Sequence, residues 1–244
     1  MTLDDDDRAQ TATFLTPDGA AADEALAEQV AAHLRDMIIR GVLRPGERLV
    51  ERRLCLSLGV SRTPMREALK LLRQDSLVEL SRNRGARVAL YGAPEAESLF
   101  EVMAALEAMA AARFSRLALP AMMGQLEDLH KTMLLHHKER RLDAYFDTNS
   151  AIHDFIIEGA GNPTLIESHR RLMLRARRGR YMAIMDDLRW EQAVQEHEAL
   201  MATLRARASD AAGAVWREHL LNTGRSVVAA LQHSGAAAAE DKAN

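Results

Sequence analysis

The hydrophobic and polar positions in the first third of the chain predict three helices followed by a β-hairpin. Apolar residues recur at helical spacing from Leu26 to Ile38, and another helical stripe runs from Ala68 to Leu72. Apolar and polar residues then alternate in two short runs separated by a polar turn, as in a β-hairpin. The predicted elements are helices over residues 25–41, 50–58 and 61–75 and strands over residues 78–80 and 88–90. This order indicates a winged helix-turn-helix.

The pattern after residue 91 is helical throughout. A linker over residues 91–98 leads into it, and no strand pattern follows Leu90. The six further helices that we predict cover residues 95–116, 120–138, 142–159, 163–183, 189–208 and 210–231. The predicted fold class is therefore mainly α, with a winged helix-turn-helix of three helices and a hairpin joined to an all-α bundle of six or seven helices.

Composition divides the chain into four segments. Residues 1–24 are acidic and rich in alanine without helical periodicity, and residues 234–244 are also rich in alanine and polar residues. We expect both ends to be disordered tails. Between them we expect a winged helix-turn-helix domain over residues 25–91 and a helical domain over residues 92–233.

The residue counts exclude several classes of protein. Hydrophobic residues make up 48% of the chain, enough to form buried cores, and the only cysteine, Cys55, cannot build a disulfide framework. No apolar run approaches the length of a membrane span, and the acidic N-terminus lacks the basic start of a signal peptide. We therefore expect a cytoplasmic protein that has no membrane partner.

Charge is concentrated in the predicted winged helix-turn-helix. Between Arg44 and Arg87 the chain has eleven arginines and lysines and five acidic residues, a net charge of +6, whereas the whole chain carries −3. A basic segment on a winged-helix pattern is typical of a protein that binds double-stranded DNA. The predicted wing turn adds Arg84 and Arg87, which suit phosphates or the minor groove.

The start of the third predicted helix carries the candidate base-reading residues. Ser61 suits the N-cap, and Pro64 is tolerated in the first turn because N–H groups there have no acceptor within the helix. Arg62 and Arg66 are four residues apart and share a face, so both can reach guanine edges or flanking phosphates. Thr63 and the free N–H groups can meet a phosphate. A pair of arginines on a solvated face would look the same, but the neighbouring helices and the wing favour DNA binding.

A second group of polar residues lies in the predicted helical domain. Asn149 and His153 are four residues apart on one helix, and His197 and His219 belong to two other helices. Three helices of a bundle can bring such residues together at one point, as in metal sites. Spacing alone favours the alternative that these are ordinary hydrogen-bonded side chains.

A basic run over residues 171–180 permits two interpretations. It is either a solvated helix face, or Arg175 or Arg178 turns inward to meet an anionic effector.

Two parts of the chain resemble a known family. Residues 35–72 and 77–88 resemble the N-terminal domain of GntR-type bacterial regulators. The C-terminal half is similar to the all-helical FCD domain of the FadR subfamily, on the stretches at residues 100–112, 149–165, 196–204 and 215–220. The resemblance implies a homodimeric, ligand-responsive transcription regulator, and for the helical domain a role in effector binding and dimerisation. Two departures are Cys55 and Leu56, where small or polar residues are usual, and Ser76, where the family commonly has glycine.

The resemblance also implies roles for individual residues at the DNA. Its DNA contacts, carried over by position, fall on one residue of the second helix, four of the third and one of the wing: Arg52, Ser61, Arg62, Thr63, Arg66 and Gly85. Together with Arg84 of the wing turn, these are the predicted DNA-binding residues, and the predicted partner is a double-stranded operator.

For the helical domain the resemblance implies a metal. FCD domains often hold a divalent ion with an aspartate and three histidines, which fall here on Asn149, His153, His197 and His219. Zinc, nickel and manganese are all compatible with these ligands. Neutral Asn149 leaves the ion its full charge, and Met103 replaces an arginine that is frequent in the subfamily. We therefore expect a small carboxylate effector at the metal, with Met103 as an apolar wall and Arg175 or Arg178 as further anion-binding groups.

The rival interpretation is an enzyme, in which three histidines hold a metal that activates water. Glu196 precedes His197 directly and so faces another side of its helix, and no other general base lies at motif spacing from the histidines. We therefore predict a non-enzymatic regulator, and a repressor in particular. A helical metal-dependent enzyme or metal-binding protein is the alternative.

Overall fold

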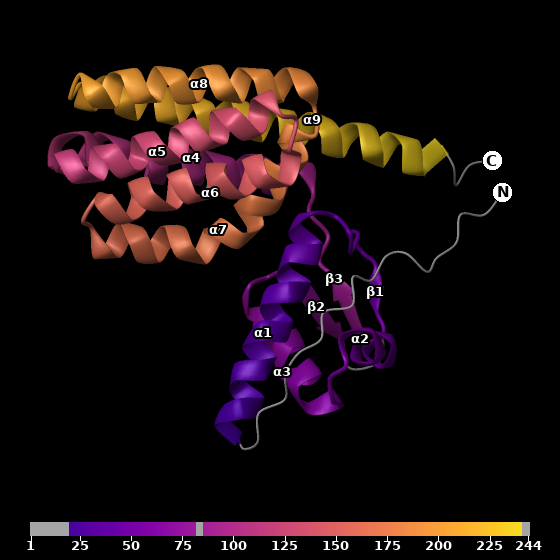
Figure 1. Cartoon of the computed structure of the whole chain (residues 1–244). Helices are drawn as coiled ribbons and strands as arrows, with labels where there is room; N and C mark the ends of the chain where they lie inside the picture. The colour runs from indigo at the N-terminus through magenta and orange to yellow at the C-terminus, as the bar shows by residue number, and fades with distance from the viewer. Residues whose placement is uncertain (1–19, 82–84, 241–244) are drawn as a thin grey trace. The chain divides into compact units, whose positions relative to one another are not determined.

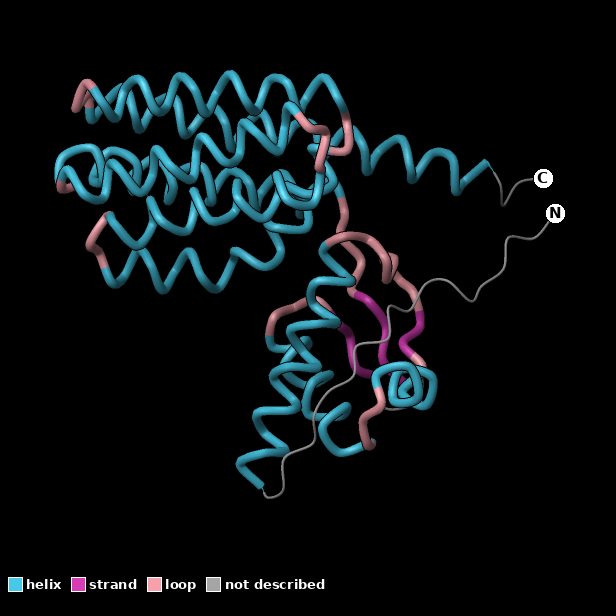
Figure 2. The backbone as a smooth tube through the Cα atoms, viewed as in Figure 1, coloured by secondary structure: helices cyan, strands magenta, loops and turns pink. Residues whose placement is uncertain are grey.

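The computed structural model describes residues 20–81 and 85–240, with side chains for residues 23–81 and 85–233. The chain forms two compact units that meet at the Tyr91–Gly92 bond. In the described residues the fold is mainly helical, with one small sheet (Figures 1 and 2). The predicted fold class, a winged helix-turn-helix and a helical bundle, is confirmed.

The N-terminal unit has the predicted order of elements and one additional strand. Its elements are α1 (Ala20–Ile39), β1 (Arg48–Leu49), α2 (Glu51–Leu58), α3 (Arg62–Gln74), β2 (Val78–Ser81) and β3 (Gly85–Val88). The sheet is antiparallel in the order β1-β3-β2, and Leu49 of β1 pairs with Ala86 of β3. β1 has no counterpart among the predicted strands, because a two-residue strand is too short to show alternation.

The apolar stripes of α1 and α3 form the core of this unit. Leu34 and Ile38 of α1 and Leu69 and Leu72 of α3 are buried where the two helices pack together. The ion pair between Arg35 and Asp75, at 2.6 Å, joins the same two segments at their edge. Because this stripe of α3 is buried, the opposite, polar face of the helix lies toward solvent.

The turn between α2 and α3 is set by its backbone. Gly59 ends α2 with a φ of 65°, in the left-handed region that glycine adopts at little cost. Ser61 is the N-cap of α3 in extended conformation, but within the described ranges its hydroxyl makes no capping hydrogen bond. The predicted cap position is correct, whereas the predicted capping bond is wrong.

Ser76 lies in a strained position before the sheet. It has a φ of 58°, the left-handed region in which a side chain is unfavourable. This position is the one where the family resemblance pointed to a glycine. The chain still makes the turn, because Leu77 N–H donates to the carbonyl of Leu72 and so ties β2 to the end of α3.

The C-terminal unit is an all-α bundle. Its helices are α4 (Ala93–Leu117), α5 (Pro120–Lys138), α6 (Leu142–Gly159), α7 (Pro163–Ile184), α8 (Asp187–Arg205) and α9 (Ser209–Glu240). The predicted bounds of α5 and α6 are confirmed to the residue, and those of α4 and α7 to within two residues. Four of the helices, α4, α6, α8 and α9, contribute residues to the polar site described below.

The helices at both ends extend beyond their predicted bounds. Residues 234–240 continue α9, whose predicted end was residue 231, because alanine has the highest helix propensity. At the other end α1 begins at Ala20 instead of after residue 24. Residues 1–19 and 241–244 lie outside the described residues.

The pairing of α4 with α9 is the most extensive in the bundle. Gly224 of α9 faces Phe100 of α4 so closely that an added Cβ would lie 2.6 Å from the Phe100 Cβ. Trp216 of α9 and Phe114 of α4 are fully buried. In the described part of the chain, no helix combines the length and hydrophobicity needed to cross a bilayer.

Candidate DNA interface and buried histidine site

The polar face of α3 presents three of the predicted DNA-binding side chains. Arg62, Thr63 and Arg66 are exposed, while Pro64 and Met65 between them are buried. Pro64 therefore anchors the start of the helix to the core. The two arginines remain on the solvent side, together with the open N-terminus of the helix, and this arrangement attracts anions.

Arg66 has a partner from α2 in the free protein. Its Nε donates to Glu51 Oε2 at 3.1 Å, and the Arg66 side chain is 62% exposed. An exposed ion pair of this kind contributes little stability and exchanges readily for another anion. Arg52, next to Glu51, is exposed on α2. Both helices thus contribute a basic group to the same exposed region.

The wing is described only in part. Gly85 is exposed at the start of β3 with a φ of 74°, and the predicted contact Arg84 lies outside the described residues. Arg87 Nη1 donates to the carbonyl of Gly46 at 2.9 Å. This bond ties the base of the hairpin to the segment before β1.

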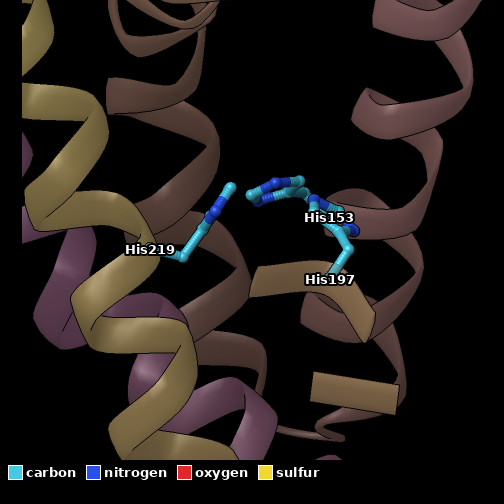
Figure 3. A group of neighbouring side chains, drawn as sticks. All are labelled: His153, His197 and His219. Carbon is cyan, nitrogen blue, oxygen red and sulfur yellow. The ribbon is translucent and has the colours of Figure 1, made fainter. Parts of the chain in front are cut away.

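The three predicted histidines meet inside the bundle. His153 of α6, His197 of α8 and His219 of α9 are buried, and a set of one ring nitrogen from each lies within 4.8 Å (Figure 3). A metal–nitrogen bond of about 2.1 Å places two ligand nitrogens at most about 4.2 Å apart, so binding needs only a small inward movement. The three rings are therefore close enough together to hold one divalent ion.

Carboxylates orient two of these rings. Glu107 Oε2 lies 2.5 Å from His153 Nδ1, and Glu196 Oε2 lies 2.6 Å from His219 Nδ1. A carboxylate at Nδ1 keeps the proton there and leaves Nε2 with its lone pair for a metal. Glu196 faces His219 rather than His197, its sequence neighbour, and this agrees with the expectation that it turns away from His197.

The histidines are neutral in this environment. Burial, and next the charge of Arg180, lower the pKa of His153 to about 3. Burial also holds the pKa of His197 well below its usual range and lowers that of His219. Burial alone would raise the pKa of Glu107, but its interactions with His153 and His169 keep it well below its usual range. Neutral imidazoles with ionised carboxylates behind them are the state that binds a metal.

Buried polar atoms without partners support the same assignment. Counting partners only among the described residues, neither ring nitrogen of His197 has a hydrogen bond, and neither does His153 Nε2. Asn149 Oδ1, on the same helix face as His153, is likewise buried and unpaired. Buried polar atoms left unpaired are costly, so these residues fit a bound ion.

The predicted effector-binding residues lie in different surroundings. Met103 is fully buried on α4. Arg175 forms an ion pair with Glu95 of α4, so its charge already has a partner. Arg178 is buried on α7. Arg178 is thus the more buried of the two arginines, and its role toward an effector stays a prediction.

Sequence reasoning missed several buried polar residues of this unit. Glu107 accepts hydrogen bonds from two histidines, His153 and His169, of which only the first is among the predicted site residues. Arg180 is buried on α7. A usable signal was present, because His169, Met173 and Arg180 fall on one stripe of α7 at heptad spacing. Counting Arg180 as part of a basic surface run concealed its place on that stripe.

Comparison with known families agrees with both units. Residues 26–88 match the model described as "Bacterial regulatory proteins, gntR family", and residues 98–222 match that of the FCD domain. The second match covers about half of the chain. These families and the named relatives below are transcription regulators and not enzymes.

Similar proteins include named repressors. The HTH-type transcriptional repressor GlaR of Escherichia coli K12 is 29% identical over 77% of this chain and 89% of its own length. The repressor RspR of the same organism is 24% identical over 82% of this chain and 88% of its own. Among solved structures, E. coli McbR/YncC superposes with a TM-score of 0.70 at 23% identity, over 86% of this chain and 98% of that one. This last likeness is one of fold.

Proposed function

Because the chain belongs to the GntR family of bacterial regulatory proteins and carries an FCD domain, we propose that it is a sequence-specific repressor that binds its operator as a homodimer. It responds to a small carboxylate in its helical domain. The observation that carries the DNA half of this proposal is the exposed α3 N-terminus, with Arg62 and Arg66 on one face. A basic winged helix whose recognition helix exposes arginines at its start is suited to the major groove.

In this proposal the DNA contacts divide by role. Arg62 and Arg66 read base edges, Thr63 and Ser61 bind a phosphate beside the helix start, and Arg52 binds the backbone from α2. Arg84 and Gly85 of the wing lie against the adjacent groove. Glu51 must release Arg66 on binding, an exchange of one exposed ion pair for another.

An apolar stripe on α4 supports the dimer. Val102, Ala105 and Met109 are exposed at helical spacing, and Val102 and Met109 are 49% and 51% exposed. Apolar stripes of this kind are covered in oligomers, and a two-fold protein reads an inverted repeat. We therefore place the dimer contact on this face, opposite the buried Phe100 and Met103. The operator is then pseudo-palindromic.

We propose that Asn149, His153, His197 and His219 hold a divalent ion, zinc, nickel or manganese. The support is the convergence of the rings, the carboxylates behind two of them, and the buried atoms without partners. Such an ion would supply a Lewis acid that accepts a carboxylate oxygen of the effector. Met103 would form an apolar wall of this pocket, and Arg178 is the better placed of the two arginines first considered.

A salt titration tests the proposed regulator against the enzymatic alternative. Binding of the protein to random duplex DNA is measured by fluorescence anisotropy at increasing salt, beside a screen for hydrolysis of model esters and phosphoesters. We expect DNA affinity that falls linearly on a log–log plot, and no hydrolysis above that of a His197→Ala control. Hydrolysis that depends on His197, without DNA binding, would contradict the proposal.

Sedimentation velocity tests the dimer separately. We expect a dimer for the unchanged protein and a monomer for Met109→Glu, because a charge would be buried in the contact. Lys131→Glu, on an exposed part of α5, serves as the control. A monomer at micromolar concentration in every variant, with or without DNA, would contradict the dimer.

A further inference from the structure

Arg180 is a buried guanidinium that has hardly any hydrogen-bond partners. It is 2% exposed on the inner stripe of α7. Its Nη1 donates to the sulfur of Met173, at 3.9 Å. Among the residues that the structure describes, Nε and Nη2 have no hydrogen-bond partner. Two N–H-bearing atoms on one edge of the fork are thus left without an acceptor.

This side chain remains charged. Burial lowers the pKa of Arg180 to about 10, which still leaves the group protonated at neutral pH. The carboxylate with the strongest electrostatic effect on Arg180 is that of Glu107. Each of its two oxygens already accepts a hydrogen bond, one from His153 and one from His169. A buried charge without its own hydrogen-bonded counterion is costly, and proteins keep such groups where a ligand supplies the counterion.

The guanidinium acts on the histidine cluster through its charge. After burial itself, the charge of Arg180 is the largest influence that lowers the pKa of His153, and it acts in the same sense on His197 and His219. An anion paired with Arg180 would offset this charge at the histidines.

A surface pocket between α6 and α7 shares Met173 with the surroundings of Arg180. It has a volume of about 280 Å³ and is lined among others by His169, Met173 and Arg177. Met173 also contacts Arg180, and His169 contacts Glu107. Arg180 itself does not line the pocket, so a ligand that enters here would reach the guanidinium by displacing the flexible Met173 side chain. The volume suits a ligand of only a few heavy atoms.

We infer that Arg180 is the anchor for the carboxylate of the effector. The planar fork of a guanidinium matches the two oxygens of a carboxylate, and Nε with Nη2 is the edge that forms such a pair. The ligand enters by the pocket between α6 and α7, and a carboxylate oxygen held by Arg180 keeps a second lone pair for the proposed ion. This inference rests on the proposed carboxylate response of the helical domain and assigns the residue that recognises the anion.

Thermal unfolding with simple probes tests this assignment. The full chain is kept in EDTA, so that no metal contributes, and its unfolding midpoint is followed with increasing sodium acetate at constant ionic strength. Acetamide is the neutral probe of the same shape. We expect acetate, but not acetamide, to raise the midpoint of the unchanged protein. Loss of a charge-assisted pair in Arg180→Gln should weaken acetate affinity by about tenfold or more.

Two further variants separate recognition from folding. Arg171→Gln, on the exposed side of α7 and paired with Glu167, should respond to acetate like the unchanged protein. Arg180→Lys keeps the charge without the fork and should respond with an intermediate affinity, which remains measurable if Arg180→Gln does not fold. A structural role would lower the midpoint without ligand but leave the rise caused by acetate unchanged.

Two results would overturn the inference. One is an equal acetate response in the unchanged protein, Arg180→Gln and Arg180→Lys, and the other is no difference between acetate and acetamide in the unchanged protein. DNA binding, measured on the same preparations, shows which proposal has failed. If the protein binds DNA and Arg180 does not matter for acetate, only this inference is wrong, whereas a protein that does not bind DNA contradicts the proposed repressor.

Discussion

The two units of this chain both hold arginines with hydrogen-bonding capacity to spare, but in opposite surroundings. Arg66 in the N-terminal unit is exposed, and replacing its ion pair with Glu51 by a pair with another anion costs little free energy. Arg180 in the C-terminal unit is buried, and within the described residues two of its three nitrogens have no partner. The first arrangement suits a large polyanion that displaces ions from a surface, and the second suits a small ligand enclosed by the protein.

This difference predicts different responses to salt. Exposed charges are screened over about 8 Å at physiological ionic strength, so binding at α3 should weaken steeply as salt rises. A buried site is screened much less, and binding near Arg180 should change little over the same range. The variants below separate the two kinds of site further, from the largest expected effect to the smallest.

The largest effect is expected at the histidine cluster. His197→Ala or His219→Ala should abolish stoichiometric metal, because each removes one of four proposed ligands. Elemental analysis of protein loaded near neutral pH measures this, with His233→Ala, an exposed histidine of α9, as the control. Unchanged protein that carries no metal and cannot be loaded would show that the cluster is a plain polar cavity.

A smaller loss is expected from the carboxylate behind His153. Glu107→Gln keeps the shape of the side chain but removes its charge, and such changes typically lower metal affinity by about 10–100-fold. Competition with a zinc-binding dye gives the affinity. Glu101→Gln, six residues before Glu107 on the exposed side of α4, should behave like the unchanged protein. Equal affinity in all three proteins would remove Glu107 from the site.

At the DNA surface, single arginines should have moderate effects. Arg62→Ala should cost about 1–3 kcal/mol of specific binding if it reads a base. Arg87→Ala should weaken binding to all sequences alike. It should also reduce the slope of log affinity against log salt concentration by about one, the loss of one phosphate contact. Anisotropy titrations on specific and scrambled duplexes compare the two. If Arg62→Ala loses the same affinity for both duplexes, Arg62 contacts a phosphate and does not read a base.

The smallest effect concerns the strained turn of the N-terminal unit. Ser76 has a φ of 58°, where glycine carries no penalty, so Ser76→Gly should raise the free energy of unfolding by about 1 kcal/mol. Thermal unfolding measures the change. Ser57→Gly, inside α2, should instead destabilise the same unit, because glycine is unfavourable in a helix interior. Stabilisation by both changes, or by neither, would contradict the account of strain.

Most of the fold could be predicted because periodicity records which faces are buried. The bounds of α5 and α6 are those expected, and the stripe of α3 correctly places Arg62 and Arg66 on the solvent side. β1 was missed because two residues carry no period, and the end of α9 because an alanine run resembles a tail in composition.

The buried site could be predicted only in outline. Spacing and family resemblance together indicated that His153, His197 and His219 would meet. They could not reveal Glu107, because a single acidic residue on α4 looks the same whether it faces water or a histidine of another helix. Arg180 was hidden in the same way among five other arginines of α7. Long-range side-chain contacts leave little trace in local sequence patterns. The exposed charges of α3, by contrast, are visible in its local pattern.

The most direct test of the central claim is selection of DNA from a random duplex library by the unchanged protein and by Arg66→Ala. The account predicts an inverted repeat for the unchanged protein, with one half-site for each α3 of a dimer. In Arg66→Ala the preference should relax at one base pair of each half-site and persist at the others. Enrichment of no motif by the unchanged protein, or the same motif with the same affinity in Arg66→Ala, would contradict base reading by α3.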